Sequence, residues 1–252
     1  MAATAGSGST ERERRARSRG LAGGARGSPP PVGRPVTPAA VLTRLAGLPS
    51  AAPGPGVLPP PPGWLRPIRT DSGDLPDRPP PGAGARAAAA LVCLFPNPSG
   101  EVRVILTERV DHGGLHSGEI SLPGGKVEPG DADLLATALR EAAEEVGLDP
   151  ASCGLRILGY LEPTWIPASN FLLTPVIGLA ARQPALAADP REVFAIFDAP
   201  LEAFLPGAPH TVVERTIRGW PLRYGAYPVA GRLVWGATAR ILAQLGEVLA
   251  AG

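Results

Sequence analysis

The sequence predicts a mixed α/β or α+β sandwich that follows a basic arm rich in proline and glycine. From Arg86 onward, short apolar segments typical of strands alternate with turn residues. An amphipathic helical pattern interrupts these strands at residues 132–146, and a second one ends the chain at residues 237–249. Strands that are interrupted by one helix and followed by another favour a layered architecture around a single core.

The part of the chain before Arg86 differs in composition from the rest. The 252 residues include 32 Gly and 32 Pro, and 31 of these 64 lie before Arg86. This density disfavours regular structure, so we expect residues 1–85 to be a largely disordered arm and residues 86–252 to be the folded domain. Two local features stand out. Thr37-Pro38 begins a short capped helix that runs to Leu45, and the apolar Trp64–Pro67 packs onto the domain surface.

Charge and cysteine content exclude several classes of protein. The formal net charge is only +1, from 24 basic and 23 acidic residues, which gives no overall attraction to nucleic acid or membrane. We see neither a secretory signal nor an apolar run long enough to span a membrane, and we expect a cytoplasmic protein. Two cysteines do not form a disulfide framework. The expected partner is a small molecule, and a homodimer is left open.

The remaining elements follow from apolar runs and turn residues. Residues 96–100 form a turn, and Gly147 suits the end of the central helix. Residues 211–217 and 222–229 are expected to pair as a hairpin. The other predicted strands are residues 87–95, 102–106, 155–161, 171–179 and 193–197.

Three glutamates in the central helix carry the strongest chemical signal. Glu141, Glu144 and Glu145 are spaced i, i+3 and i+4, so a helix places all three carboxylates on one face. Like charges this close cost stability unless cations neutralise them, and oxygen ligands favour Mg²⁺ or Mn²⁺ over Zn²⁺. Arg140 precedes the group and can orient a carboxylate through a bidentate contact.

A pair of glycines precedes this helix. Gly124 and Gly125 allow the backbone to turn tightly and to approach a ligand or a metal closely. A metal cluster beside such a loop suits diphosphate hydrolysis, because metal ions neutralise phosphate charge and activate water.

This segment resembles the Nudix box, Gly-x5-Glu-x7-Arg-Glu-U-x-Glu-Glu-x-Gly-U, where U is apolar. Gly125 begins the match, Asp131 replaces the first Glu, and eight residues rather than seven precede Arg140. The Asp and the extra residue are similar to the coenzyme A diphosphatase subfamily. Upstream, Ile105–Arg109, His116, Gly118 and Leu122–Gly125 are in register with the signature of that subfamily. Within this register the residue type differs at three positions, where Val110 replaces Ser, Gly114 replaces the second Arg and Leu122 replaces Phe.

The resemblance implies a Nudix-type α/β/α sandwich around a mixed β-sheet. It implies a metal-dependent enzyme in which water attacks the diphosphate of coenzyme A or acyl-CoA and yields 3′,5′-ADP and 4′-phosphopantetheine. The implied catalytic residues are Arg140 and the metal ligands Glu141, Glu145 and, third, Glu144. The residues expected to contact substrate are Arg109, His116, Gly124, Gly125 and Lys126.

Other interpretations stay open. Gly114 replaces an arginine of the subfamily signature, so ADP-ribose or another nucleoside diphosphate derivative is an alternative substrate. A Nudix-like module that binds a nucleotide without cutting it is a second alternative, although such modules typically lose box carboxylates. In a third interpretation, the arginine-rich arm is the functional part and binds the protein to a polyanion. Glu119 is a weaker candidate for an outer carboxylate or a proton acceptor. Glu192 could cap a strand or supply a late metal ligand.

Overall fold

The computed structural model describes residues 35–76, 78–79, 84–110, 119–217 and 219–252. One compact unit extends over residues 34–252. Within the described ranges, no helix is both long and apolar enough to cross a membrane.

The larger sheet is mixed and forms the centre of the unit. Among the described residues it has eight strands, and its main path runs β10-β4-β3-β9-β7. Strands β3 and β9 are parallel, whereas β4 and β6 are antiparallel to β3. The bounds are β3 (Arg86–Pro96), β4 (Val102–Arg109), β5 (Ile120–Ser121), β6 (Gly124–Lys126), β7 (Arg156–Tyr160), β8 (Thr164–Ile166), β9 (Phe171–Leu179) and β10 (Val193–Pro200).

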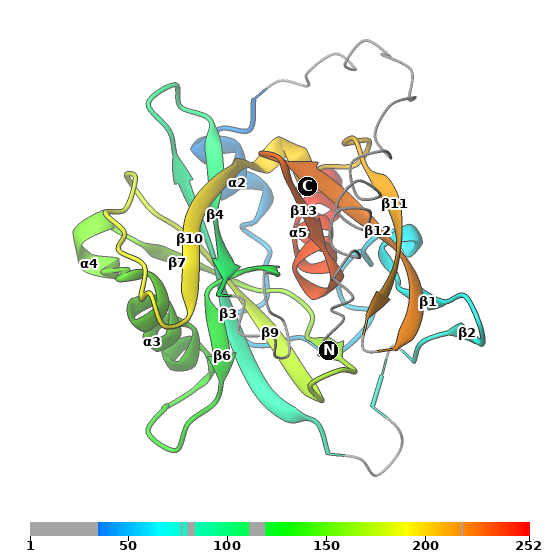
Figure 1. Cartoon of the computed structure of the whole chain (residues 1–252). Coiled ribbons are helices and arrows are strands. Elements are labelled where there is room, and N and C mark those ends of the chain that lie inside the picture. Colours follow the sequence, from blue (N-terminus) through cyan, green and yellow to red (C-terminus); the bar gives the residue numbers. More distant parts are fainter. Residues whose placement is uncertain (1–34, 77, 80–83, 111–118, 218) are drawn as a thin grey trace, which may run out of the picture. The chain divides into compact units, whose positions relative to one another are not determined.

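Helices cover both faces of this sheet, which confirms the predicted sandwich (Figure 1). Helices α3 (Leu134–Val146) and α4 (Pro150–Cys153) lie on one side, and α2 (Pro38–Arg44) and α5 (Gly236–Ala251) lie on the other. Asp133 caps α3 by accepting a hydrogen bond from the Ala136 backbone N–H at 2.8 Å. Gly147 ends the helix in the left-handed conformation, with φ of 65°, as predicted.

The burial of β3 on both faces explains why its sequence is a continuous apolar run. Val92 and Leu94 point into the core on the α5 side, while Leu91 and Cys93 point into the core beneath α3. A strand that is buried on both faces cannot alternate polar and apolar residues.

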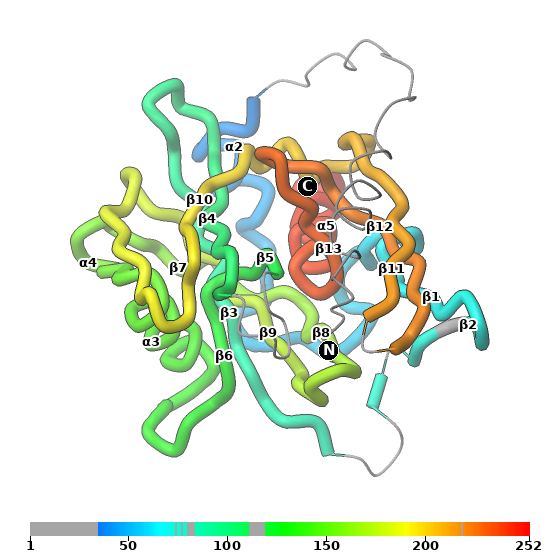
Figure 2. Tube along the Cα trace, viewed as in Figure 1, coloured from blue at the N-terminus to red at the C-terminus, as the bar shows by residue number. Residues whose placement is uncertain are grey.

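A second, smaller sheet lies on the same side of the larger sheet as α5 (Figure 2). In the described part of the chain it has five strands, ordered β11-β12-β1-β2 with β13 paired to β12. The predicted hairpin is present as β11 and β12. The bounds are β1 (Ile68–Arg69), β2 (Gly73–Asp74), β11 (Thr211–Ile217), β12 (Trp220–Val229) and β13 (Arg232–Trp235), with 3₁₀ helices at Gly63–Leu65 and Leu201–Phe204.

The folded unit begins much earlier than the boundary predicted at residue 86. The predicted short helix is present as α2, with Thr37 as its cap, and Val41 is fully buried in the core on the α5 side. Leu65 is also 0 % exposed. The indole of Trp64 lies so close to Gly225 that a Cβ there would overlap it. A few large apolar side chains therefore anchor a segment whose average composition suggested disorder, while residues 1–34 lie outside the described ranges.

We predict that the segment from residue 35 to residue 76 is required for stability. Leu65→Ala should lower the free energy of unfolding by about 2–5 kcal/mol, because it leaves a cavity in the core. Chemical denaturation measures this loss. A chain that begins at Asp77 should unfold at a much lower temperature than a chain that begins at Arg34. Equal melting temperatures for these two truncated chains would contradict the extended boundary.

Candidate functional site

The glycine loop and the glutamate helix meet next to β3. Strand β6 pairs with β3 so that Gly124 lies opposite Ala90 and Gly125 opposite Ala89. A Cβ at Gly124 would overlap the β3 backbone, and one at Gly125 would overlap the Glu141 carboxylate. The close approach of the β3 backbone therefore requires a glycine at position 124, as predicted from the sequence, whereas at position 125 the neighbour is the mobile end of the Glu141 side chain.

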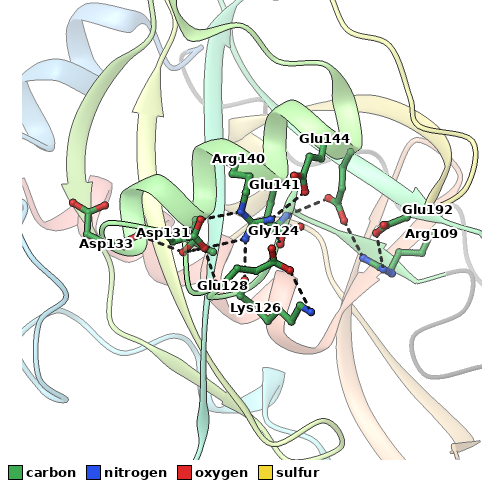
Figure 3. A network of polar contacts seen from close by, with 12 residues as sticks. Arg109, Gly124, Lys126, Glu128, Asp131, Asp133, Arg140, Glu141, Glu144 and Glu192 are labelled. Carbon is green, nitrogen blue, oxygen red and sulfur yellow. Dashed lines mark hydrogen bonds and ion pairs between the residues drawn. The ribbon is translucent and has the colours of Figure 1, made fainter.

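Arg140 organises the loop and one part of the carboxylate face (Figure 3). Its guanidinium donates to both oxygens of Asp131, at 2.9 and 3.0 Å, and to the Lys126 carbonyl at 3.0 Å. It also donates to Glu141 at 2.9 Å and to Glu144 at 3.0 Å. Hydrogen bonds from Arg140 hold the pKa of the Asp131 carboxyl far below its usual range. Asp131 thus ties the loop to the helix.

Glu145 is the most deeply buried carboxylate of the group, with 2 % of the residue exposed. It accepts hydrogen bonds from the Gly124 backbone N–H at 3.2 Å and from Arg109 at 3.3 Å. Burial raises the pKa of Glu145 to about 7, although Arg109 and the Gly124 N–H oppose this shift. A carboxylate in this position is incompletely compensated and would gain from a nearby cation.

A fourth carboxylate comes from a distant part of the chain. Glu192, just before β10, lies 3.8 Å from the Arg109 guanidinium, and its charge contributes to raising the pKa values of both Glu141 and Glu145. Burial is the larger cause for Glu141, and Arg140 opposes it. Glu192, a weak candidate in the sequence, therefore lies near the Nudix box. The tertiary fold brings it there, because it is far from the box in the sequence.

The donor chemistry of this face fits a hard divalent cation. The carboxylates of Glu141, Glu144 and Glu145 supply oxygen ligands. Within the described ranges, no three Asp, Glu, His or Cys side chains are already gathered as a metal site. In the structure these carboxylates form ion pairs with Arg140 and Arg109.

A pocket of about 630 Å³ opens beside the box and has Arg109, Gly124 and Gly125 in its wall. This size suits a small-molecule ligand. Glu119 also lines the pocket, next to the undescribed residues 111–118. The rest of the lining comes mainly from apolar residues, including Trp165 and Trp235, that no motif in the sequence marked as functional.

The structure does not place the other predicted contact residues, Lys126 and His116, in the pocket wall. Lys126 is mostly exposed and forms an ion pair with Glu128 at 3.3 Å, and its side chain is not part of the pocket wall. His116 and Gly114 lie outside the described residues. His210, which was not among the predicted contact residues, stacks on Trp64 with 4.0 Å between the ring centroids.

The fold and this loop–helix arrangement define a Nudix domain. The family model described as "NUDIX domain" matches residues 85–213, about half of the chain. The chain belongs to the Nudix family. The match starts close to the predicted boundary but leaves out α2, the β1–β2 hairpin, β12, β13 and α5.

Two relatives identified by sequence agree with this assignment. Nudix hydrolase 15, mitochondrial, of Arabidopsis thaliana is 40 % identical over 169 residues, which cover 65 % of this chain and 58 % of that relative. The chain thus spans less than two thirds of that protein. The uncharacterized Nudix hydrolase NudL of Photorhabdus laumondii is 34 % identical over 162 residues, covering 64 % of this chain and 84 % of NudL. The crystal structure of RenU, a Nudix hydrolase from M. smegmatis, has 25 % identity and a TM-score of 0.38, covering 48 % and 74 % of the two chains.

The buried Glu145 predicts a pH-dependent stability in metal-free protein. Its pKa is about 7 when folded and near 4.5 when unfolded, so the folded state binds more protons between these values. The free energy of unfolding should therefore fall as pH rises from about 4.5 to about 7. Glu145→Gln should lack this component, which we expect to be on the order of 2–3 kcal/mol. Denaturation with a chelator at several pH values measures it, with the surface variant Glu214→Gln as control. Parallel curves for wild type and Glu145→Gln would contradict the assignment.

Proposed function

We propose that this protein is a metal-dependent diphosphatase of nucleoside diphosphate derivatives and that its favoured substrate is coenzyme A or an acyl-CoA. The observation that carries the proposal is the position of Glu145. This buried carboxylate lies between Arg109 and the Gly124 N–H, both of which belong to the wall of a pocket large enough for such a substrate. Both sequence relatives described above are named as Nudix hydrolases, which supports hydrolysis as the reaction.

The residues divide into distinct roles in this proposal. Glu141, Glu145 and Glu144 would hold Mg²⁺ or Mn²⁺, and Glu192 would add a further carboxylate from the β10 side. A bound ion would neutralise phosphate charge and increase the acidity of water. Arg140 orients Glu141 and Glu144 through its anchor on Asp131.

Arg109 and the glycine loop would bind the diphosphate itself. The Arg109 guanidinium offers donors in a geometry that matches phosphate oxygens. Gly124 and Gly125 have no side chains that would keep the substrate from the backbone of β6. His116 is expected to contact phosphate as well, from the segment before the loop. We propose that the adjacent Glu119 is a candidate proton acceptor, because it lines the same pocket.

The preference for coenzyme A rests on the box variant. Asp131 replaces the usual Glu, and an extra residue precedes Arg140, as in the coenzyme A subfamily that the sequence resembles. In the structure Asp131 accepts hydrogen bonds from Arg140 through both of its oxygens, so the shorter side chain still anchors the arginine that contacts the box glutamates. ADP-ribose remains the alternative substrate. A binding module without catalysis is disfavoured, because Arg140 and all three box glutamates are present.

We predict that Glu145→Gln removes most turnover while the fold is retained. Loss of one anionic ligand should lower kcat on the order of a hundredfold at limiting Mg²⁺. The assay uses coenzyme A with Mg²⁺ or Mn²⁺ and identifies the products by mass. Glu214→Gln, a glutamate on the exposed strand β11, should retain the wild-type rate. Wild-type turnover in the Glu145 variant would remove this residue from the metal site.

Substrate choice is tested by comparing kcat/KM for coenzyme A, 3′-dephospho-coenzyme A and ADP-ribose. We expect coenzyme A to be preferred, with a raised KM because Gly114 replaces an arginine. A charge-assisted hydrogen bond contributes roughly 1.5–3 kcal/mol, so Gly114→Arg should lower KM by about tenfold or more if the backbone accepts it. A preference for ADP-ribose of more than about tenfold would leave only the general diphosphatase function.

A further inference from the structure

The pocket beside the box reaches well beyond the Nudix match. Its wall includes Gly125 of the box and also Pro67, Leu75 and Pro76, which flank the β1–β2 hairpin. Figure 1 shows β1 and β2 on the opposite side of the folded unit from α3. A ligand with its diphosphate at the box therefore has space to extend between the two sheets toward this hairpin.

The hairpin is fixed in place at the pocket wall by its own contacts. Arg66 donates a hydrogen bond to the Leu75 carbonyl at 2.9 Å, which joins the two ends of the hairpin. Strand β1 pairs with β12, and the Arg69 guanidinium lies 5.1 Å from the ring centre of Trp220, another pocket residue. The wall is thus preorganised.

The wall on this side is mainly apolar, and Arg66 and Ser169 add polar groups to it. Leu75, Pro76, Trp165, Ile166, Trp220 and Leu222 present mainly carbon to the pocket. The Trp165 N–H is already bonded to Asn170, at 3.0 Å. Sugar hydroxyls that lose water against such a wall lose hydrogen bonds, whereas apolar groups gain free energy in proportion to the area they bury.

We propose that the β1–β2 hairpin is a substrate-specificity element that selects, among nucleoside diphosphate derivatives, those carrying an extended apolar group on the second phosphate. Leu75 is the specificity-determining residue that we assign to it. The proposal rests on the proposed diphosphatase function and adds a selection rule made by residues outside the matched Nudix region. In the reaction, water adds across the bridging P–O–P bond, and the apolar group leaves as an alkyl phosphate with AMP as the second product.

The test uses ADP esterified on its β-phosphate with a methyl, a butyl or an octyl group. These compounds share the nucleotide and the scissile bond and differ only in apolar length. With the full chain and Mg²⁺, kcat/KM should rise along the series, with the octyl ester preferred over the methyl ester by about tenfold or more. ADP-ribose, with a polar sugar in the same place, should resemble the methyl ester.

Two variants locate the preference. Leu75→Asn keeps the side-chain size but makes the wall polar, and it should reduce the octyl-to-methyl ratio to about threefold or less. Leu75→Ala provides a second readout and should also reduce the ratio, since the apolar contact is lost. Leu58→Asn changes a partly buried leucine of the same N-terminal segment that does not line the pocket, and it should keep the wild-type ratio.

The outcomes separate this inference from the proposed function. Equal kcat/KM for all three esters in the wild-type chain would overturn the hairpin's role while leaving the diphosphatase function intact. A wild-type preference that Leu75→Asn and Leu75→Ala both retain would also overturn it. Absence of turnover with every ester, coenzyme A and ADP-ribose would overturn the proposed function itself, and the inference with it.

Discussion

Strand β3 is the constraint on which the rest of the structure depends. It pairs with β4, with β9 and with the glycine strand β6, and both of its faces are covered by core. Because Gly124 has no side chain, β6 can lie against the backbone of β3 and carry the loop next to helix α3. The position of the carboxylates therefore follows from the packing of a central strand that bears none of them.

Electrostatic balance at the box is achieved by two arginines with different origins. Arg140 belongs to the box and holds the loop through Asp131, while Arg109 ends β4 and reaches Glu145. Each arginine compensates carboxylates that helical spacing forces together. Glu145 remains the least compensated of them because desolvation outweighs both its hydrogen bonds, which is the property expected of a residue that needs a further positive charge.

The segments on either side of the family match contribute to the core and to the pocket wall. Residues 35–76 supply core residues such as Val41 and Leu65 and then one wall of the pocket. The C-terminal strands and α5 supply the wall around Trp235. The glycine loop of the family match is thus combined with pocket-wall residues that lie outside that match.

The sequence by itself determined the local features of this protein. Helical spacing placed the glutamates on one face, the Gly124-Gly125 pair indicated a close approach, and apolar runs identified β3, β4, β9 and α5, because each of these signals depends on neighbours in the chain. The sequence predicted the short helix and the packing of Trp64–Pro67, but the tertiary structure decided that residues 35–76 belong to the core of the fold. It also brought Glu192 and Arg109 to Glu145 and placed Leu75 in the wall of the same pocket as Gly125. These relations join residues far apart in sequence. The pairing of β10 with β4 brings Glu192 beside Arg109, whereas the packing of the smaller sheet against the larger one places Leu75 in the pocket wall.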